Sequence, residues 1–133
     1  MTEQLSEIYI IEDDEESRRA TELLLSVSGF KTWSFDSAES LLDSPEALNQ
    51  LSTASNACVL ADLRLPGMNG LQLFQWLRNA EIAVPVILIS GHADDATIAQ
   101  AIKAGVEKFL LKPVRPVELI ETLHAATHQD AAG

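Results

Sequence analysis

Five short apolar runs alternate with amphipathic stretches along this chain of 133 residues, and this alternation restricts the fold more than any other feature. The runs are Ile8–Ile11, Phe30–Phe35, Cys58–Ala61, Val86–Ile89 and Lys108–Leu111. Three of them are almost purely aliphatic, as expected of parallel strands buried on both faces. The Phe30–Phe35 run alternates polar and apolar residues, which predicts a strand at the edge of the sheet. Strands and helices in alternation predict an α/β fold, a parallel sheet with right-handed crossovers and helices on both faces.

The stretches between the runs carry helix start and stop signals. The predicted N-terminal caps are Asp14, Ser37, Ser44 before Pro45, Asn69, and Asp94 or Asp95, and Pro116 begins the last helix. The first helix has an apolar set at helical spacing, Ala20, Leu23, Leu24 and Val27, and Gly29 ends it. The third has Leu71, Phe74, Trp76 and Leu77. We count five helices from these signals, with a short second helix from Ser37 through Leu42, after which Ser44-Pro45-Glu46 has the pattern of a cap followed by proline at a first helical position.

Charge and composition exclude several classes of protein. The chain has 20 acidic and 9 basic residues, a net charge of −11, which would repel nucleic acid and anionic membranes. The chain has one cysteine, Cys58, so it cannot form an internal disulfide. We expect Cys58 to be a small buried apolar residue. No signal-peptide pattern and no apolar run of about 20 residues occurs, so we expect a cytoplasmic protein without a membrane span.

Polar residues follow four of the five predicted strands at the point where each strand ends. Glu12, Asp13 and Asp14 follow the first, Asp62 the third, Ser90 the fourth and Lys112 the fifth. Ligands of open α/β sheets bind at the carboxyl ends of the strands. The sequence therefore predicts a functional site made of these residues.

Four motifs in order resemble the receiver domain of two-component response regulators, over the chain from about Ile8 to about Leu123. They are Ile8–Asp14, Val59–Gly70, Ile87–His92, and Ala104-Gly105 followed by Phe109–Pro113. Each motif alone is weak, but four in order, each ending a predicted strand, form a specific signature. The resemblance implies a flavodoxin-like, doubly wound sheet of five parallel strands in the order 2-1-3-4-5. It also implies one receiver domain over residues 1–133, with a core of about residues 7–127 and a frayed tail at 128–133.

Granting that strand order, Asp62 lies beside Glu12 and Asp13, and three close carboxylates repel one another unless a cation intervenes. The resemblance implies Mg²⁺, with Mn²⁺ as a substitute, held by Asp13, Asp62 and the backbone carbonyl of Arg64, with Glu12 acting through water. Asp62 is then the phosphorylated residue. Other implied roles are a phosphoryl contact for Ser90 and Lys112, an aromatic switch for Phe109, control of dephosphorylation for Arg64 and His92, and a cis peptide bond before Pro113.

The implied function is a signalling switch that catalyses only its own phosphorylation and dephosphorylation. It accepts phosphate from a histidine kinase or a histidine phosphotransfer protein and changes the surface of helix 4, strand 5 and helix 5, from Asp94 to about Ala126. This surface is also where we expect a homodimer. This domain itself should not bind nucleic acid, although an output domain beyond residue 133 could bind DNA.

Three rival readings fit the residues less well. A haloacid-dehalogenase-like phosphatase needs a second aspartate two residues after its nucleophile, where this chain has Arg64. A pure interaction module would not need the set of acids, Ser90 and Lys112. A flavin- or dinucleotide-binding domain needs a glycine-rich phosphate loop after the first strand, where this chain has Glu12, Asp13 and Asp14.

Overall fold

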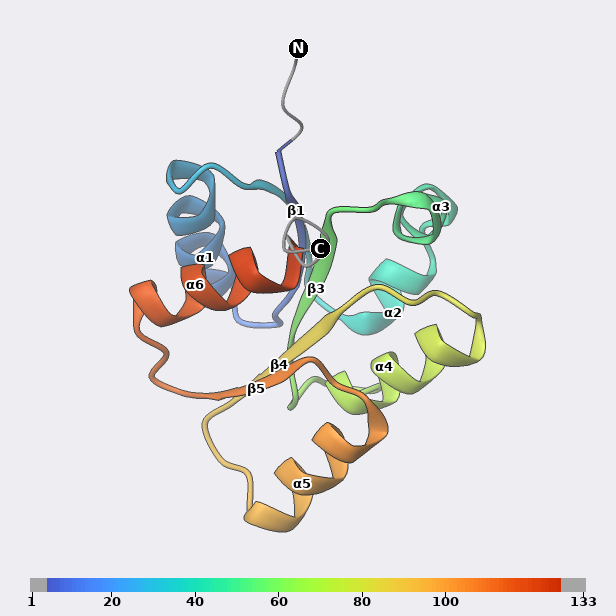
Figure 1. Ribbon diagram of the computed structural model, residues 1–133, viewed down its shortest axis with the longest axis vertical. Helices are drawn as coiled ribbons and strands as arrows, with labels where there is room; N and C mark the ends of the chain where they lie inside the picture. The colour runs from blue at the N-terminus through green and yellow to red at the C-terminus, as the bar shows by residue number, and fades with distance from the viewer. Residues whose placement is uncertain (1–4, 128–133) are drawn as a thin grey trace.

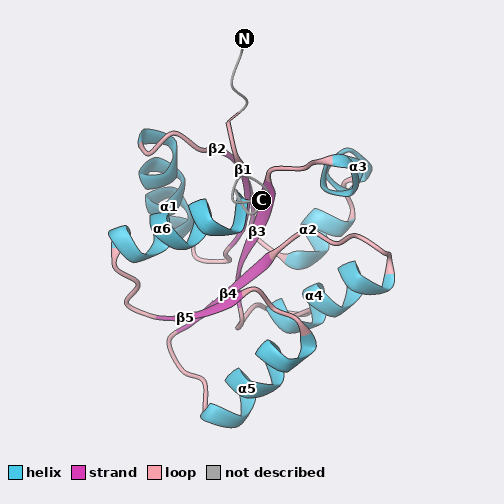
Figure 2. Cartoon of the chain, viewed as in Figure 1, coloured by secondary structure: helices cyan, strands magenta, loops and turns pink. Residues whose placement is uncertain are grey.

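The computed structural model describes residues 5–127, which fold as one doubly wound α/β unit (Figure 1, Figure 2). The strands are β1 (Glu7–Ile11), β2 (Lys31–Phe35), β3 (Ala57–Asp62), β4 (Val86–Ser90) and β5 (Lys108–Leu111). The helices are α1 (Glu15–Val27), α2 (Ala38–Leu42), α3 (Pro45–Thr53), α4 (Gly70–Asn79), α5 (Asp95–Ala104) and α6 (Pro116–Thr127). All pairings are parallel and the order is β2-β1-β3-β4-β5, which confirms the expected topology and the edge position of β2. The tail predicted at 128–133 lies outside the described residues.

Six helices occur in residues 5–127 instead of the five expected, because the segment between β2 and β3 forms two. Ser44 interrupts it with an extended backbone, at φ −105° and ψ 98°. A residue that precedes proline is pushed away from helical angles, and here Pro45 follows. The Ser44 side chain then accepts a hydrogen bond from the Ala47 amide and caps α3 as a new helix.

Two apolar cores lie on opposite faces of the sheet. Helices α1 and α6 cover one face, and α2, α3, α4 and α5 cover the other (Figure 1). Side chains alternate along each strand, so Ile8, Ile10 and Leu60 enter the first core while Tyr9 and Val59 enter the second. Cys58 is fully buried in the first core, as predicted, and burial raises the pKa of its thiol.

The buried face of α1 differs from the prediction. Leu23 and Val27 are 67% and 74% exposed, and the fully buried residue of this helix is Leu25. Leu24 packs against the core on this face as predicted, whereas Ala20, Leu23 and Val27 are exposed, so the apolar spacing identified only part of the buried face.

The other helix signals are largely confirmed. Asp14, Ser37, Asn69 and Asp94 cap their helices, so Asp94 and not Asp95 begins α5. In α4, Phe74 and Leu77 are buried as expected together with Leu73, whereas Trp76 is 37% exposed. None of the helices within residues 5–127 has the length and apolar character needed to cross a bilayer.

Candidate functional site

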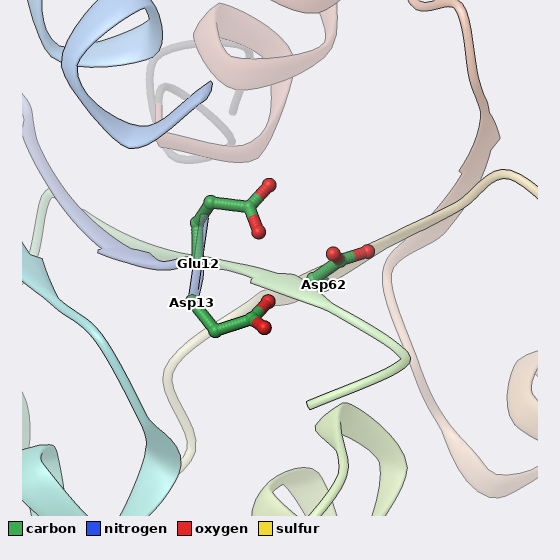
Figure 3. Close-up of side chains that lie close together, drawn as sticks. All are labelled: Glu12, Asp13 and Asp62. Carbon is green, nitrogen blue, oxygen red and sulfur yellow. The ribbon is translucent and has the colours of Figure 1, made fainter. Parts of the chain in front are cut away.

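Three carboxylates meet at the carboxyl end of the central strands. Glu12 and Asp13 follow β1, and Asp62 ends β3 next to it. Their side chains offer oxygens that all lie within 4.8 Å of one another, and Figure 3 shows the Glu12 and Asp13 carboxylates directed to the side on which Asp62 lies. The sequence prediction that these acids form one cluster is confirmed at the level of geometry.

The sheet positions these side chains, because backbone hydrogen bonds between neighbouring strands continue at the residues that directly follow the strand ends. The Glu12 amide donates to the Phe35 carbonyl at 3.1 Å, and the Leu63 amide, directly after Asp62, donates to the Ile89 carbonyl at 2.8 Å. The Lys112 amide donates to the Ser90 carbonyl at 2.9 Å. The backbone at Glu12, Leu63 and Lys112 is therefore positioned by the sheet.

The positively charged Lys112 side chain lies close to two of the acids. Its Nζ lies 3.2 Å from Asp62 Oδ2 and 3.6 Å from Glu12 Oε1. Burial lowers the pKa of the Lys112 ammonium, but the Asp62 and Glu12 carboxylates outweigh this effect and the pKa is raised overall. Lys112 therefore stays charged at neutral pH.

One lysine does not balance three carboxylates. Burial raises the pKa of the Glu12 carboxyl and the nearby Asp62 carboxylate raises it further, against the opposing effects of the Asp14 amide and Lys112. The Glu12 and Asp62 side chains are each only 12% exposed, so water screens their repulsion incompletely. A cluster of hard oxygen donors with excess negative charge fits a divalent cation such as Mg²⁺.

Three more predicted residues, Arg64, Ser90 and His92, lie around Asp62 and Lys112. An open pocket of about 250 Å³ is lined by Asp62, Arg64, Ser90, Gly91, His92 and Lys112. Ser90 is buried, and its hydroxyl donates to the His92 carbonyl at 2.9 Å and accepts from the His92 amide at 3.1 Å. In this conformation Ser90 thus bonds to its own loop, and no hydrogen bond joins it to Asp62.

Phe109 does not line this pocket. It is half-buried against the core beneath α5 and pairs in register with Leu88, on the face of the sheet that also carries Ser90. The peptide bond between Lys112 and Pro113 is cis.

Two contacts at the site were missed by the sequence analysis. Arg18 of α1 donates from Nη1 to the Glu12 carbonyl at 2.9 Å, and Glu39 of α2 accepts from the Met68 amide at 2.8 Å. The Arg18 contact has a weak signal, since it lies six positions after Glu12 and one turn into a predicted helix. The Glu39 contact spans 29 positions and has no signal in the sequence.

Comparison with known proteins gives one consistent family. The sequence profile described as the response regulator receiver domain matches residues 8–124. Nodulation protein W of Bradyrhizobium diazoefficiens is 34% identical over 125 residues, which cover 92% of this chain and 52% of that protein. The transcriptional regulatory protein FixJ of the same organism is 32% identical over 122 residues, covering 92% of this chain and 57% of its own.

Solved structures agree with these relatives. The crystal structure of FixJ-N superposes with a TM-score of 0.80 at 30% identity and covers 95% of this chain and 96% of its own. The chain spans about half the length of the curated relatives that it matches.

Proposed function

The chain belongs to the response regulator receiver domain family of two-component systems, and on that premise we propose that it is a switch phosphorylated on Asp62. Receiver domains are parts of signalling regulators and not classical enzymes, so the reaction we propose is the chain's own phosphorylation and dephosphorylation. The observation that carries the proposal is the cluster of Glu12, Asp13 and Asp62 with Lys112 Nζ 3.2 Å from Asp62.

Asp62 is the residue best suited to accept the phosphoryl group. It borders the open pocket and its carboxylate is held by Lys112, whereas Glu12 is drawn toward its protonated form by burial. A carboxylate oxygen of Asp62 would bond to phosphorus as the bond from phosphorus to the donor's histidine nitrogen breaks. The product is an acyl phosphate, and Lys112 is within reach of its oxygens.

The acidic cluster supports a divalent cation, Mg²⁺ with Mn²⁺ as a substitute. Asp13, Asp62 and the Arg64 carbonyl would hold it, with Glu12 acting through water. When bound, the cation would neutralise charge on the phosphoryl oxygens. Three carboxylates with one lysine support this assignment, because carboxylates this close together repel one another when no cation is bound between them.

Ser90 and Phe109 would convert phosphorylation into a change of surface. The Ser90 hydroxyl now bonds to His92, and exchanging that bond for one to the phosphoryl group would draw the loop after β4 inward. Phe109, on the same face of the sheet, could then fill the space that the loop leaves. Arg64 and His92 line the pocket that water must cross and would set the lifetime of the phosphoryl group.

The surface that changes is α5, β5 and α6, residues 94–126. Each of its three elements exposes one large apolar side chain, Ile102 on α5, Leu111 on β5 and Val117 on α6. We propose that an output domain or a second copy of this chain binds there. The donor is a histidine kinase or a histidine phosphotransfer protein, and the setting is the cytoplasm, where such donors deliver phosphate.

The proposal is tested by metal-dependent labelling. Acetyl phosphate with Mg²⁺ should add one phosphoryl group to the wild-type protein, visible as a mass increase, and EDTA should prevent it. Asp62→Asn should remove labelling, while Asp36→Asn, at an exposed aspartate directly after β2, should not. Equal labelling of Asp62→Asn would refute the assignment, and no labelling of the wild-type chain would favour a pure interaction module.

A further inference from the structure

The loop from β3 to α4 carries Arg64, whose carbonyl we assign to the metal, and this loop is held at both ends. The Leu63 amide donates to Ile89, and the Gly70 amide donates back to the Leu63 carbonyl at 3.0 Å. These two bonds close the loop at its base. They leave its tip, Gly67 and Met68, to be fixed by something else.

The side chain that fixes the tip is Glu39, in the first turn of α2. Its Oε2 accepts the Met68 amide hydrogen at 2.8 Å. Among the described residues, no other side chain from outside the loop forms a hydrogen bond with the backbone of residues 64–68. Glu39 is therefore the single side-chain tether between α2 and this loop.

The turn at Gly67 is shaped around that carboxylate. Gly67 has φ +75°, a conformation that favours glycine, and a Cβ built there would lie 2.6 Å from Glu39 Oε2. Only a residue without a side chain lets the carboxylate sit this close to the turn. The glycine and the glutamate thus act together to hold the loop tip against α2.

We propose that Glu39 is a positioning residue for the phosphorylation site. Holding the tip at Met68 fixes the course of the loop from Leu63 onward, and with it the direction of the Arg64 carbonyl. This inference rests on the proposed function, because it needs Arg64 to contribute a metal ligand. Glu39 itself touches neither the metal nor the phosphoryl group.

Two variants separate the hydrogen bond from the charge. Glu39→Ala removes the acceptor, whereas Glu39→Gln keeps an amide oxygen for Met68, and both remove one negative charge. Glu46→Ala is a matched control, because Glu46 occupies the same position in the first turn of α3, is exposed, and makes no hydrogen bond to the loop. Comparing the two Glu39 variants therefore isolates the tether.

The first measurement is Mg²⁺ affinity by titration calorimetry on the full chain. Outer partners of metal ligands typically contribute about 10- to 100-fold in affinity, and for one exposed tether we expect about three- to tenfold weaker binding in Glu39→Ala. Glu39→Gln and Glu46→Ala should stay within about twofold of wild type. The second measurement is hydrogen exchange of the Met68 amide without metal, which should accelerate in Glu39→Ala alone.

The outcomes distinguish the inference from the proposed function. Wild-type Mg²⁺ affinity in Glu39→Ala, or an equal loss in Glu39→Ala and Glu39→Gln, would overturn the positioning role. Unchanged exchange at Met68 in Glu39→Ala would overturn it as well. A third outcome is that the wild-type chain binds no Mg²⁺ while Met68 exchange accelerates in Glu39→Ala as expected. The proposed metal site would then be wrong, and Glu39 would be a structural contact that positions no metal ligand, which also refutes the inference.

Discussion

Replacing Glu12 by glutamine should stabilise the metal-free protein. Glu12 sits in a cluster where its oxygen lies within 4.8 Å of oxygens from both Asp13 and Asp62, and its side chain is only 12% exposed. Glutamine has nearly the same shape and keeps an oxygen that can accept the Asp14 amide hydrogen, now 3.2 Å from Glu12 Oε2. The substitution therefore removes charge while changing little of the packing.

The magnitude follows from the distances. At an effective dielectric constant of about 40, between a protein surface and bulk water, each repulsion costs about 1.7 kcal/mol at the upper limit of 4.8 Å. The substitution also removes the attraction between Glu12 and Lys112 Nζ at 3.6 Å, which is about 2.3 kcal/mol at the same dielectric constant. Solvent weakens this attraction further, because Lys112 is 41% exposed. Removing two repulsions and one attraction leaves a gain of about 1 kcal/mol, and relief from burying a charge raises it to about 1–2 kcal/mol.

The assay is thermal and urea unfolding in EDTA at pH 7, where Glu12→Gln should raise Tm by about 3–6 °C. The pH dependence has a fixed sign. The pKa of Glu12 is raised in the folded state above its ordinary value of 4.5. The wild-type protein is therefore more stable when Glu12 is protonated, and it loses this contribution to its stability as pH rises from 4.5 through the folded pKa. The advantage of the variant should therefore shrink as pH falls toward 4.5.

Glu16→Gln, at an exposed acid in the first turn of α1, is the control and should change stability by less than about 0.5 kcal/mol. A destabilised Glu12→Gln protein at pH 7 in EDTA would refute the reasoning. So would an advantage that stays constant from pH 7 to pH 4.5, since the charge of Glu12 would then not be its source.

Two further predictions concern the phosphorylated state. Arg64→Ala and His92→Ala should each change the rate of autodephosphorylation several-fold while Mg²⁺ affinity stays within about twofold, since both side chains line the pocket without belonging to the acidic cluster. The rate is measured as the loss of the phosphorylated mass with time, and an unchanged rate in both variants would contradict this prediction. Ser90→Ala should still accept phosphate but should fail to change amide chemical shifts across residues 94–126 on phosphorylation or with beryllofluoride, because a charge-assisted hydrogen bond of about 1.5–3 kcal/mol is removed. A full wild-type response in that variant would show that the hydroxyl is not the trigger.

Local sequence was sufficient for the framework of the fold and for the position of the site. Strand burial follows from continuous apolar runs, and caps such as Asn69 follow from side chains that bond to the next turn. Because parallel strands end at the same edge of a sheet, polar residues that follow those strands must gather there, as Glu12, Asp62 and Lys112 do. The strand order came from the resemblance of motifs to a known family and not from these rules.

Other features depended on contacts between distant segments, which local periodicity does not encode. The rotation of α1, which exposes Leu23 and Val27, depended on how the whole helix packs on the sheet beside α6. The present bond of Ser90 to His92 and the reach of Glu39 to Met68 depended on the course of two loops. The sequence around a polar side chain is compatible with several hydrogen-bond partners, and only the packed tertiary structure brings one of them within bonding distance.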